Sequence, residues 1–177
     1  MFYLSIDLET TGLNPETCQI LSIGIIVEDT KRKLNFNDCP KLHIIIPHKE
    51  IHGEPFALNM NKDLIETISK HGGCKNPQDR DLLSKEHKAY FTPSINVVDV
   101  LHSFLVENNL SDGRFATLNV AGKNFGTFDK LFLEQLPDWN KRFKIGKRVI
   151  DPSILFVDWK NDKTLPNLTE CKKRANI

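Results

Sequence analysis

Several features that mark other protein classes are scarce in this sequence of 177 residues. Cysteine occurs only four times, with no Cys-x-x-Cys, so no zinc or redox motif and no disulfide framework is expected. No apolar stretch approaches the ~20 residues that a membrane-spanning helix needs. The first residues lack the basic-then-apolar pattern of a signal peptide. We therefore expect a protein of the reducing cytoplasm with no membrane contact.

An excess of charge of either sign is also lacking. Lysine and arginine total 24 and aspartate and glutamate 23, so the formal net charge is +1. That balance argues against a protein that coats long duplexes by neutralising phosphates, and it leaves room for a small site that binds a short strand or one end. The hydrophobic share of 40% is ordinary, and the length suits a single domain over residues 1–177.

The order of the apolar patterns predicts one α/β domain with a mixed five-stranded sheet flanked by helices. Residues 2–9 alternate apolar and polar, and two further apolar runs follow closely, so the first three strands are expected to form an antiparallel meander. Helical spacing then alternates with short strands, and polar residues 70–94 are expected to form a surface insertion. The expected later strands are 18–27, 42–46, 115–121 and 148–150, and the expected helices are 58–72, 94–105, 127–136, one from 152 and one from 166.

The most informative segment is the first strand and the turn after it, residues 4–13 with the sequence LSIDLETTGL. Asp7 and Glu9 are two residues apart, so a strand projects both carboxylates from one face. Two such acids repel each other unless a cation lies between them, and a divalent metal with oxygen ligands is the simplest candidate. The alternative is a strand whose polar face meets water.

A third acid, Asp129, follows a predicted strand in the segment 120–133. Phe128 and Phe132, four residues apart, are spaced to pin the expected helix to the sheet, so that Asp129 in the first helical turn faces the strand ends. The alternative is that Asp129 only interacts with the helix dipole.

Together, the motifs Asp-Leu-Glu-Thr-Thr-Gly-Leu and Asn-x-x-x-Phe-Asp resemble the first two motifs of the DEDD 3′-to-5′ exonuclease superfamily. The resemblance is closest to its DnaQ-like branch, which includes proofreading subunits, oligoribonucleases and ribonuclease T. It implies the ribonuclease-H-like fold. Residues 148–152 and 165–171 also look like the family's fifth strand and the helix before its third motif, so the resemblance covers nearly the whole chain.

The resemblance implies a metal-dependent enzyme that removes nucleotides from the 3′ end of single-stranded DNA or RNA. In this family four carboxylates hold two Mg²⁺ or Mn²⁺ ions, and Asp7, Glu9 and Asp129 match three of them, as catalytic residues and as metal ligands. One ion lowers the pKa of the attacking water, and the other stabilises the leaving 3′ oxygen.

Eight further residues match positions that contact the terminal nucleotide in this family. The turn after the first motif contributes four, for which the alternative is a turn whose hydroxyls serve only the turn itself. The segment 54–61 contributes two, and the second motif two more. The substrate-binding candidates are Thr10, Thr11, Gly12, Leu13, Met60, Asn61, Asn124 and Phe128.

The family's third motif, His-x-x-x-x-Asp, is missing. All six histidines precede Asp129. Asp151 is better explained as a helix cap and Asp158 as an exposed helix residue. The favoured explanation is a truncated chain. The alternatives are a naturally short chain and a substitute acid. We expect the 177-residue chain to bind metal weakly and to turn over poorly.

A basic run containing Lys141, Arg142, Lys144, Lys147 and Arg148 surrounds Phe143 and is either a phosphate-binding segment or a solvated loop. A catalytically inactive nucleic-acid-end-binding or scaffold domain is the rival function, and a ribonuclease-H-like endonuclease is a third. The choice between DNA and RNA, and a homodimer or polymerase partner, stay open.

Overall fold

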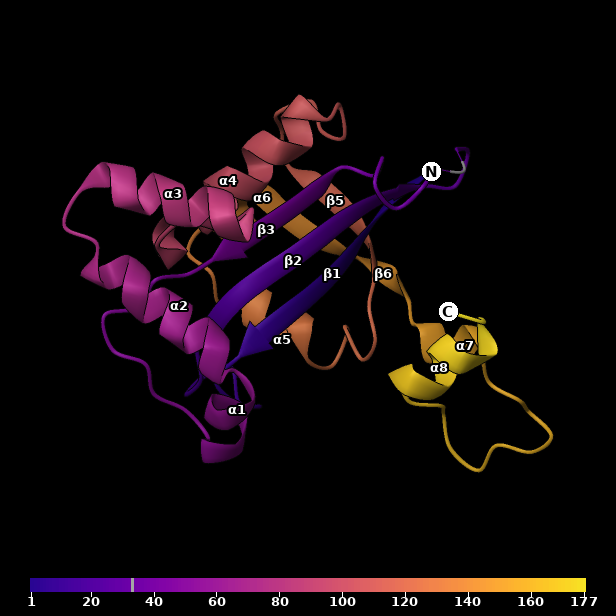
Figure 1. The fold of residues 1–177 in the computed structure, drawn as a ribbon. Helices are drawn as coiled ribbons and strands as arrows, with labels where there is room; N and C mark the ends of the chain where they lie inside the picture. The colour runs from indigo at the N-terminus through magenta and orange to yellow at the C-terminus, as the bar shows by residue number, and fades with distance from the viewer. Residues whose placement is uncertain (33) are drawn as a thin grey trace.

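A mixed sheet of six strands forms the centre of the computed structural model, which describes residues 1–32 and 34–177 (Figure 1). Its strand order is β4-β3-β2-β1-β5-β6. β1 pairs antiparallel with β2, and β2 antiparallel with β3, whereas the β1–β5, β5–β6 and β3–β4 pairs are parallel. The strands are β1 (Phe2–Thr10), β2 (Ile20–Asp29), β3 (Lys41–Ile45), β4 (Tyr90–Phe91), β5 (Ala116–Ala121) and β6 (Phe143–Ile150).

This architecture confirms the predicted α/β fold class, a mixed sheet of the ribonuclease-H-like kind. The sheet gains a sixth strand that the sequence did not predict, because β4 has only two residues and therefore no measurable alternation. The helices are α1 (Pro55–Met60), α2 (Lys62–Gly73), α3 (Pro77–His87), α4 (Ser94–Glu107), α5 (Asp129–Leu133), α6 (Trp139–Arg142), α7 (Pro152–Leu155) and α8 (Leu168–Arg174).

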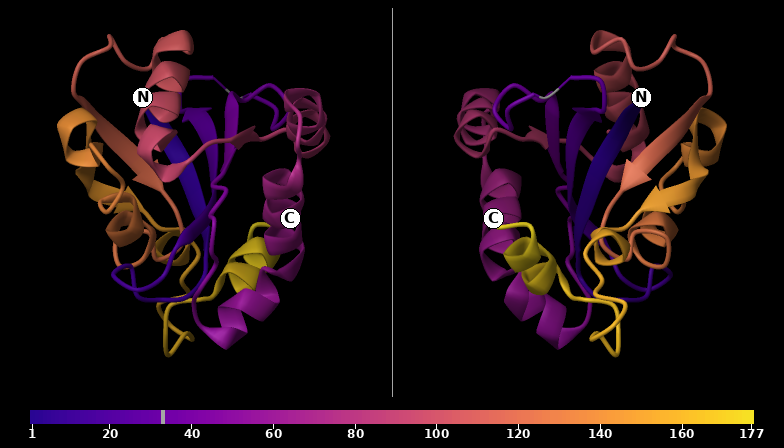
Figure 2. Two further views of the ribbon diagram at one scale, coloured as in Figure 1. Left: turned by 90° about the vertical axis from the view of Figure 1, so that its left-hand side faces the viewer. Right: turned by 90° about the vertical axis from the view of Figure 1, so that its right-hand side faces the viewer.

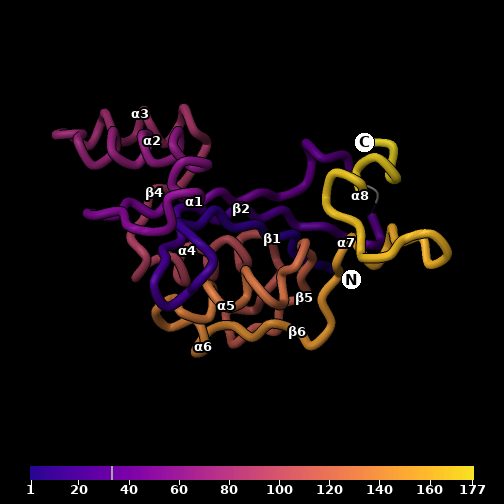
Figure 3. The backbone as a smooth tube through the Cα atoms, turned by 90° about the horizontal axis from the view of Figure 1, so that it is seen from below, coloured from indigo at the N-terminus to yellow at the C-terminus, as the bar shows by residue number. Residues whose placement is uncertain are grey.

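The main core lies on one face of the sheet, between β1 and the layer of α4, α5 and α6 (Figure 3). The alternation in β1 buries Leu4, Ile6 and Leu8 on this face. Val97 and Leu101 of α4 belong to the same cluster, as do residues of α5 and α6. Strand β1 is therefore anchored by its apolar side, and its polar side faces away from the main core.

The other face is covered only in part. A smaller cluster packs Leu21 and Ile45 against Ile68 of α2. α2 and α8 lie on this side of the sheet but at opposite ends, and the middle of β1 and β2 lies between them (Figures 1 and 2). Much of the polar face of β1 is therefore left open.

Three local expectations differ from the structure, at two helices and at Asp158. The helix expected from Leu58 onward is broken at Asn61, which separates α1 from α2 and has non-helical backbone angles. The helix expected over 127–136 is shorter, because only Asp129–Leu133 is helical. Residues 70–94 contain α3 and β4. Asp158 is exposed as expected but lies in no helix, since its carboxylate accepts hydrogen bonds from the Lys160 N–H and the Asn161 amide.

The basic run is also ordered differently from the expected loop. Lys144, Lys147 and Arg148 are exposed on β6, an edge strand, where charged side chains discourage pairing with another chain. Phe143 is buried in the main core. It is therefore not available to stack on a nucleic-acid base.

Among the described helices, none is both long and apolar enough to cross a membrane.

Candidate functional site

Asp7 and Glu9 lie on the open face of the sheet, as the strand alternation predicts. In the β1–β2 register, Asp7 is paired with Gly24 and Glu9 with Ser22. Paired residues of neighbouring strands share a face, so the absence of a side chain at Gly24 leaves space beside the Asp7 carboxylate. A register shift between Glu9 and Thr10 then ends the regular pairing. The two acids thus lie at the end of a rigid strand, with open space next to one of them.

Asp129 approaches the same strand from α5, of which it is the first residue. Its Oδ1 accepts a hydrogen bond from the backbone N–H of Leu8 at 3.2 Å, between the two acids of β1 in sequence. The side chain is buried, with 4% of the residue exposed. Gly122 permits the close approach of this segment, because a Cβ there would lie 2.9 Å from the carbonyl oxygen of Ile6.

The charge of Asp7 affects the ionisation of the other two carboxylates. Burial raises the pKa of Asp129 to about 6, with a further rise from the charge of Asp7, against the lowering effect of hydrogen bonds from the Leu8 amide and its own. Burial also raises the pKa of Asp7. The pKa of Glu9 is raised by burial and by Asp7, and a hydrogen bond from Asn61 lowers it. Although Asp7 and Glu9 still reach solvent, the protein around them disfavours their charged forms.

The donor chemistry of these three residues fits a hard divalent cation, which prefers carboxylate oxygens and would favour their ionised forms. Their geometry is not a closed ligand set. Within residues 1–32 and 34–177, no three His, Cys, Asp or Glu side chains converge closely enough to hold a metal ion. One oxygen of Asp129 is already bonded to the Leu8 amide.

The turn after β1 is held by its own hydrogen bonds. The Thr10 hydroxyl donates to the carbonyl of Gly12 at 2.8 Å, and the Thr11 hydroxyl accepts from the Gln19 N–H at 2.8 Å. Both threonines are buried. In this structure, both hydroxyls stabilise the turn.

Glu54 forms the outer side of this turn. Its carboxylate accepts a hydrogen bond from the Leu13 N–H at 3.0 Å, and its own N–H donates to the Thr11 carbonyl at 2.7 Å. A Cβ at Gly12 would lie 2.7 Å from the Glu54 carboxyl carbon. The chain passes tightly under Glu54 here, which explains the glycine.

An apolar rim surrounds the end of β1. Leu13 is 73% exposed, Met60 67% and Phe56 76%. The first projects from the turn, and the other two are four residues apart on α1, so they share one face of that helix. Asn61 lies beside the rim, where its side-chain amide donates to the Thr10 carbonyl at 3.1 Å and its hydrogen bond to Glu9 lowers that residue's pKa. Met60 is thus exposed and available to contact a ligand.

The second motif is linked to the start of α7. Asn124 is exposed with a positive φ of 57°, and its N–H donates to Oδ2 of Asp151 at 2.9 Å. The other oxygen of Asp151 caps α7 by accepting from Ser153, which confirms the predicted cap. Burial raises the pKa of Asp151, but these hydrogen bonds outweigh it and lower the pKa overall. Phe128 packs partly buried against Phe132, with ring centroids 5.2 Å apart.

Asp7 lies between two hollows of the open face. One, of about 360 Å³, extends toward Lys123 and α7, and the other, of about 530 Å³, extends toward Lys41, His43 and His87. Both are flanked by lysine side chains, which suits an anionic ligand laid across the strand.

Sequence reasoning missed two residues that shape the site. Glu54 holds the Leu13 amide, and Gln19 bonds Thr11 through both of its backbone groups. Neither belongs to a motif. Only the tertiary fold reveals them, because Glu54 is 41 residues from its partner in sequence.

No family model matches the sequence, and no curated protein matches it. Solved structures of exonuclease I do resemble the fold. A product-bound exonuclease I aligns with a TM-score of 0.58 at 13% identity, over 99% of this chain and 38% of that one. Escherichia coli exonuclease I in complex with a 5cy-dA13 oligonucleotide aligns with a TM-score of 0.56 at 15% identity, over 99% and 36%. This chain therefore spans less than two fifths of the length of those proteins, and at such identity the likeness shows the fold.

Proposed function

We propose that this protein is a metal-dependent 3′-to-5′ exonuclease of the DEDD superfamily, acting on single-stranded DNA or RNA. The observation that carries the proposal is the hydrogen bond from the Leu8 N–H to Asp129. It brings the acid of the second motif to the strand that bears Asp7 and Glu9. The fold, which it shares with exonuclease I, supports the same conclusion.

Asp7, Glu9 and Asp129 are the residues that would hold Mg²⁺ or Mn²⁺ in this proposal. Bound at these oxygens, the ions would supply a water of lowered pKa and stabilise the charge that develops on the leaving oxygen. The pKa of each carboxylate is raised, so the folded protein disfavours the charged forms. A bound cation would offset the repulsion between the charged carboxylates and would therefore favour their ionised forms.

The substrate end is proposed to lie over the turn and the apolar rim. Leu13 and Met60 offer apolar surface to a terminal base, to which Phe56 adds an aromatic face. Asn61 holds both the Thr10 carbonyl and Glu9, so it aligns the turn with the acid. The remaining proposed contacts come from Thr10, Thr11, Gly12, Asn124 and Phe128.

The proposal covers residues 1–177 as one domain, and these residues alone, which contain no His-x-x-x-x-Asp after Asp129, are expected to turn over slowly. All four cysteines are free, which suits the reducing cytoplasm that we propose as its compartment.

The test uses a 5′-labelled single-stranded oligonucleotide with Mg²⁺ or Mn²⁺. We expect a slow ladder of products shortened from the 3′ end, absent with Asp7→Ala and unchanged with Asp99→Ala, an exposed acid of α4 outside the site. A substrate with a blocked 3′ end should resist. Cutting of the blocked substrate would instead support an endonuclease.

A second function, an inactive domain that binds nucleic-acid ends, is favoured by one observation. Within the described residues, Asp7, Glu9 and Asp129 do not converge closely enough to hold a metal ion, whereas the exposed apolar rim that would contact a terminal base is present. Binding of the oligonucleotide without any shortening, in either metal, would support this alternative over the exonuclease.

A further inference from the structure

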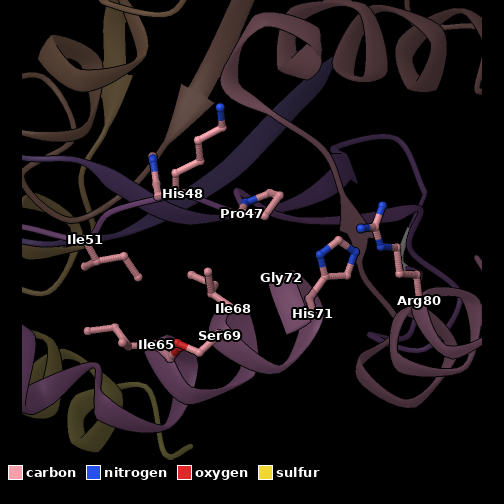
Figure 4. A pocket seen from close by; sticks show the side chains of 10 residues that line it. Pro47, His48, Ile51, Ile65, Ile68, Ser69, His71, Gly72 and Arg80 are labelled. Carbon is pink, nitrogen blue, oxygen red and sulfur yellow. The ribbon is translucent and has the colours of Figure 1, made fainter. Parts of the chain in front are cut away.

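A separate hollow of about 720 Å³ lies between the loop after β3 and the helices α2 and α3 (Figure 4). This α2–α3 hollow does not include Asp7, Glu9 or Asp129. Its volume is typical of small-molecule sites. Its lining includes His48, Lys49, Ile51, Ile65, His71 and Arg80.

The two ends of the α2–α3 hollow differ in chemistry. Ile51 and Ile65 form an apolar end, with Ile68 near the middle, whereas His71 and Arg80 lie together at the other end (Figure 4). A ligand that fills this space must therefore carry an apolar or flat part and a polar part. Nucleotides have this division, with a base that has π faces and a charged phosphate.

The polar end favours an anion. The lining includes the cations Arg80 and Lys49 and no acid. Arg80 makes a long hydrogen bond of 3.4 Å to the Cys74 carbonyl, and within the described residues it forms no ion pair. Its sequence neighbours Asp79 and Asp81 do not line the hollow. The guanidinium thus keeps donors free for a phosphate.

His71 is held in a fixed orientation at the same end. Its ring stacks on Phe91 with a centroid distance of 4.2 Å and an interplanar angle of 6°. Burial, with a smaller effect from Arg80, lowers its pKa, which favours the neutral ring. A neutral, immobilised imidazole offers both a donor and an acceptor beside the guanidinium.

The wall of the hollow is tied to the turn that follows Asp7 and Glu9. His48 Nε2 lies 2.7 Å from the Ile20 carbonyl, and its Nδ1 lies 3.3 Å from the side-chain amide of Gln19. Gln19 in turn bonds the backbone and hydroxyl of Thr11. A continuous chain of hydrogen bonds therefore connects the hollow to the proposed nucleotide turn.

We propose that the α2–α3 hollow is a second nucleotide-binding site, which holds a phosphate at Arg80 beside His71 and a base against Ile51 and Ile65. The nucleotide is either free or a unit of a single strand whose 3′ end lies at Asp7. The second source rests on the proposed exonuclease function, while the site itself does not.

The first test follows backbone amides of the ¹⁵N-labelled full chain by NMR in EDTA, with adenosine monophosphate, inorganic phosphate or oligo-dT as separate probes. Gly72 lines the hollow, and Gly113 in a distant loop serves as the control. We expect a saturable shift of Gly72 with a nucleotide probe and none of Gly113. A Gly72 amide unmoved by every probe, or moved by phosphate alone, would overturn the proposal.

The second test measures oligo-dT binding by fluorescence anisotropy, again in EDTA. Arg80→Ala is compared with Arg114→Ala, which removes an exposed arginine that pairs with Asp112. If a strand is the ligand, Arg80→Ala should weaken binding by about 3- to 10-fold and reduce the salt slope by about 0.7, and Arg114→Ala should not. If monophosphate is the ligand, its Gly72 shift should require Arg80 while oligo-dT binding is unchanged.

The two proposals fail separately. A chain that shortens no oligonucleotide but shifts Gly72 through Arg80 keeps this site and loses the exonuclease. A chain that produces the product ladder but shows no Gly72 shift with any nucleotide probe keeps the exonuclease and loses this site. Equal Gly72 shifts in wild type and Arg80→Ala would overturn the nucleotide site whatever the activity.

Discussion

The two faces of β1 place neighbouring residues in opposite environments. Leu4, Ile6 and Leu8 are buried under α4 and α5, whereas Asp7 and Glu9 between and beyond them stand on the open side. The covered face fixes where the strand lies. The open face then presents two carboxylates at fixed positions, and its own side-chain packing contributes little to stability. The strand can therefore hold repelling charges because its other side supplies the stability.

Asp129 is the point where the two faces meet. It comes from α5, which belongs to the covered side, yet the charge of Asp7 raises its pKa and its oxygen accepts a hydrogen bond from the Leu8 amide. Its side chain is buried like the residues of the covered face, and it is a carboxylate like Asp7 and Glu9 of the open face. Changes at Asp129 should therefore affect stability and activity together, which separates it from the remaining residues of either face.

The comparison is tested most strongly by truncating neighbours on opposite faces. Ile6→Ala should lower the free energy of unfolding by roughly 2–5 kcal/mol, because Ile6 is 3% exposed and its truncation leaves a cavity. Ser5→Ala, on the open face, should change it by less than about 0.5 kcal/mol. Urea unfolding followed by circular dichroism measures both. Similar losses for the two variants would contradict the division between faces.

The next effect concerns the pH dependence caused by Asp129. Its folded pKa of about 6 exceeds the ordinary value of 3.8, so the folded state holds the proton more tightly. The resulting stability is fully present below pH 3.8 and is lost as pH rises toward 6, by about 3 kcal/mol in total. Asp129→Asn keeps an acceptor for the Leu8 amide but cannot ionise.

Unfolding in EDTA at pH 4 and pH 7 should therefore show a loss of stability with rising pH that is smaller in Asp129→Asn than in the wild-type chain. Addition of Mg²⁺ at pH 7 should restore stability to the wild type alone, since binding favours the ionised carboxylate. The same pH slope in both proteins would mean that Asp129 does not carry the effect.

A smaller difference is expected between two glycines that border the turn after β1. A Cβ at Gly53 would clash with the backbone oxygen of Thr11, whereas at Gly12 the closest atoms belong to the side chains of Cys18 and Glu54. Side chains can move aside and backbone cannot. We expect Gly53→Ala to cost about 1–3 kcal/mol and Gly12→Ala less. Thermal unfolding measures the loss of stability in both variants. A loss in Gly12→Ala that equals or exceeds that in Gly53→Ala would show that the backbone around Gly53 can move aside.

The difference between what the sequence predicted and what it did not follows the range of the interactions. The alternation in β1 predicted the faces of Asp7 and Glu9, because side-chain direction in a strand is local. The cap at Asp151 was equally local. By contrast, Asn61, where the helix breaks, bonds Thr10, which is 51 positions away in sequence. Glu54 bonds Leu13, which is 41 positions away.

Helix ends and short strands were the other limit. The pattern over 127–136 is helical in spacing, but the structure keeps only Asp129–Leu133 in a helix. Strand β4 is too short for any period, and it exists because β3 offers it hydrogen-bonding partners. Of the candidate site, the positions of the acids relative to one strand were predictable. Their hydrogen bonds, their ionisation and the separate α2–α3 hollow were not.

The smallest expected effect lies at the edge of the open face, where Asn61 donates to the Thr10 carbonyl and stabilises ionised Glu9. Asn61→Ala should cost about 1 kcal/mol of stability through the lost hydrogen bond. It should also raise the pKa of Glu9 further, because burial and the charge of Asp7 then act unopposed.

If ionised Glu9 is required for cleavage, the acid limb of the pH–rate profile must move to higher pH, while the rate at alkaline pH falls much less. Asn59→Ala, an exposed position on α1, is the control. A uniform fall in rate at every pH would instead mean that Asn61 only holds the turn in shape and does not affect the ionisation of Glu9.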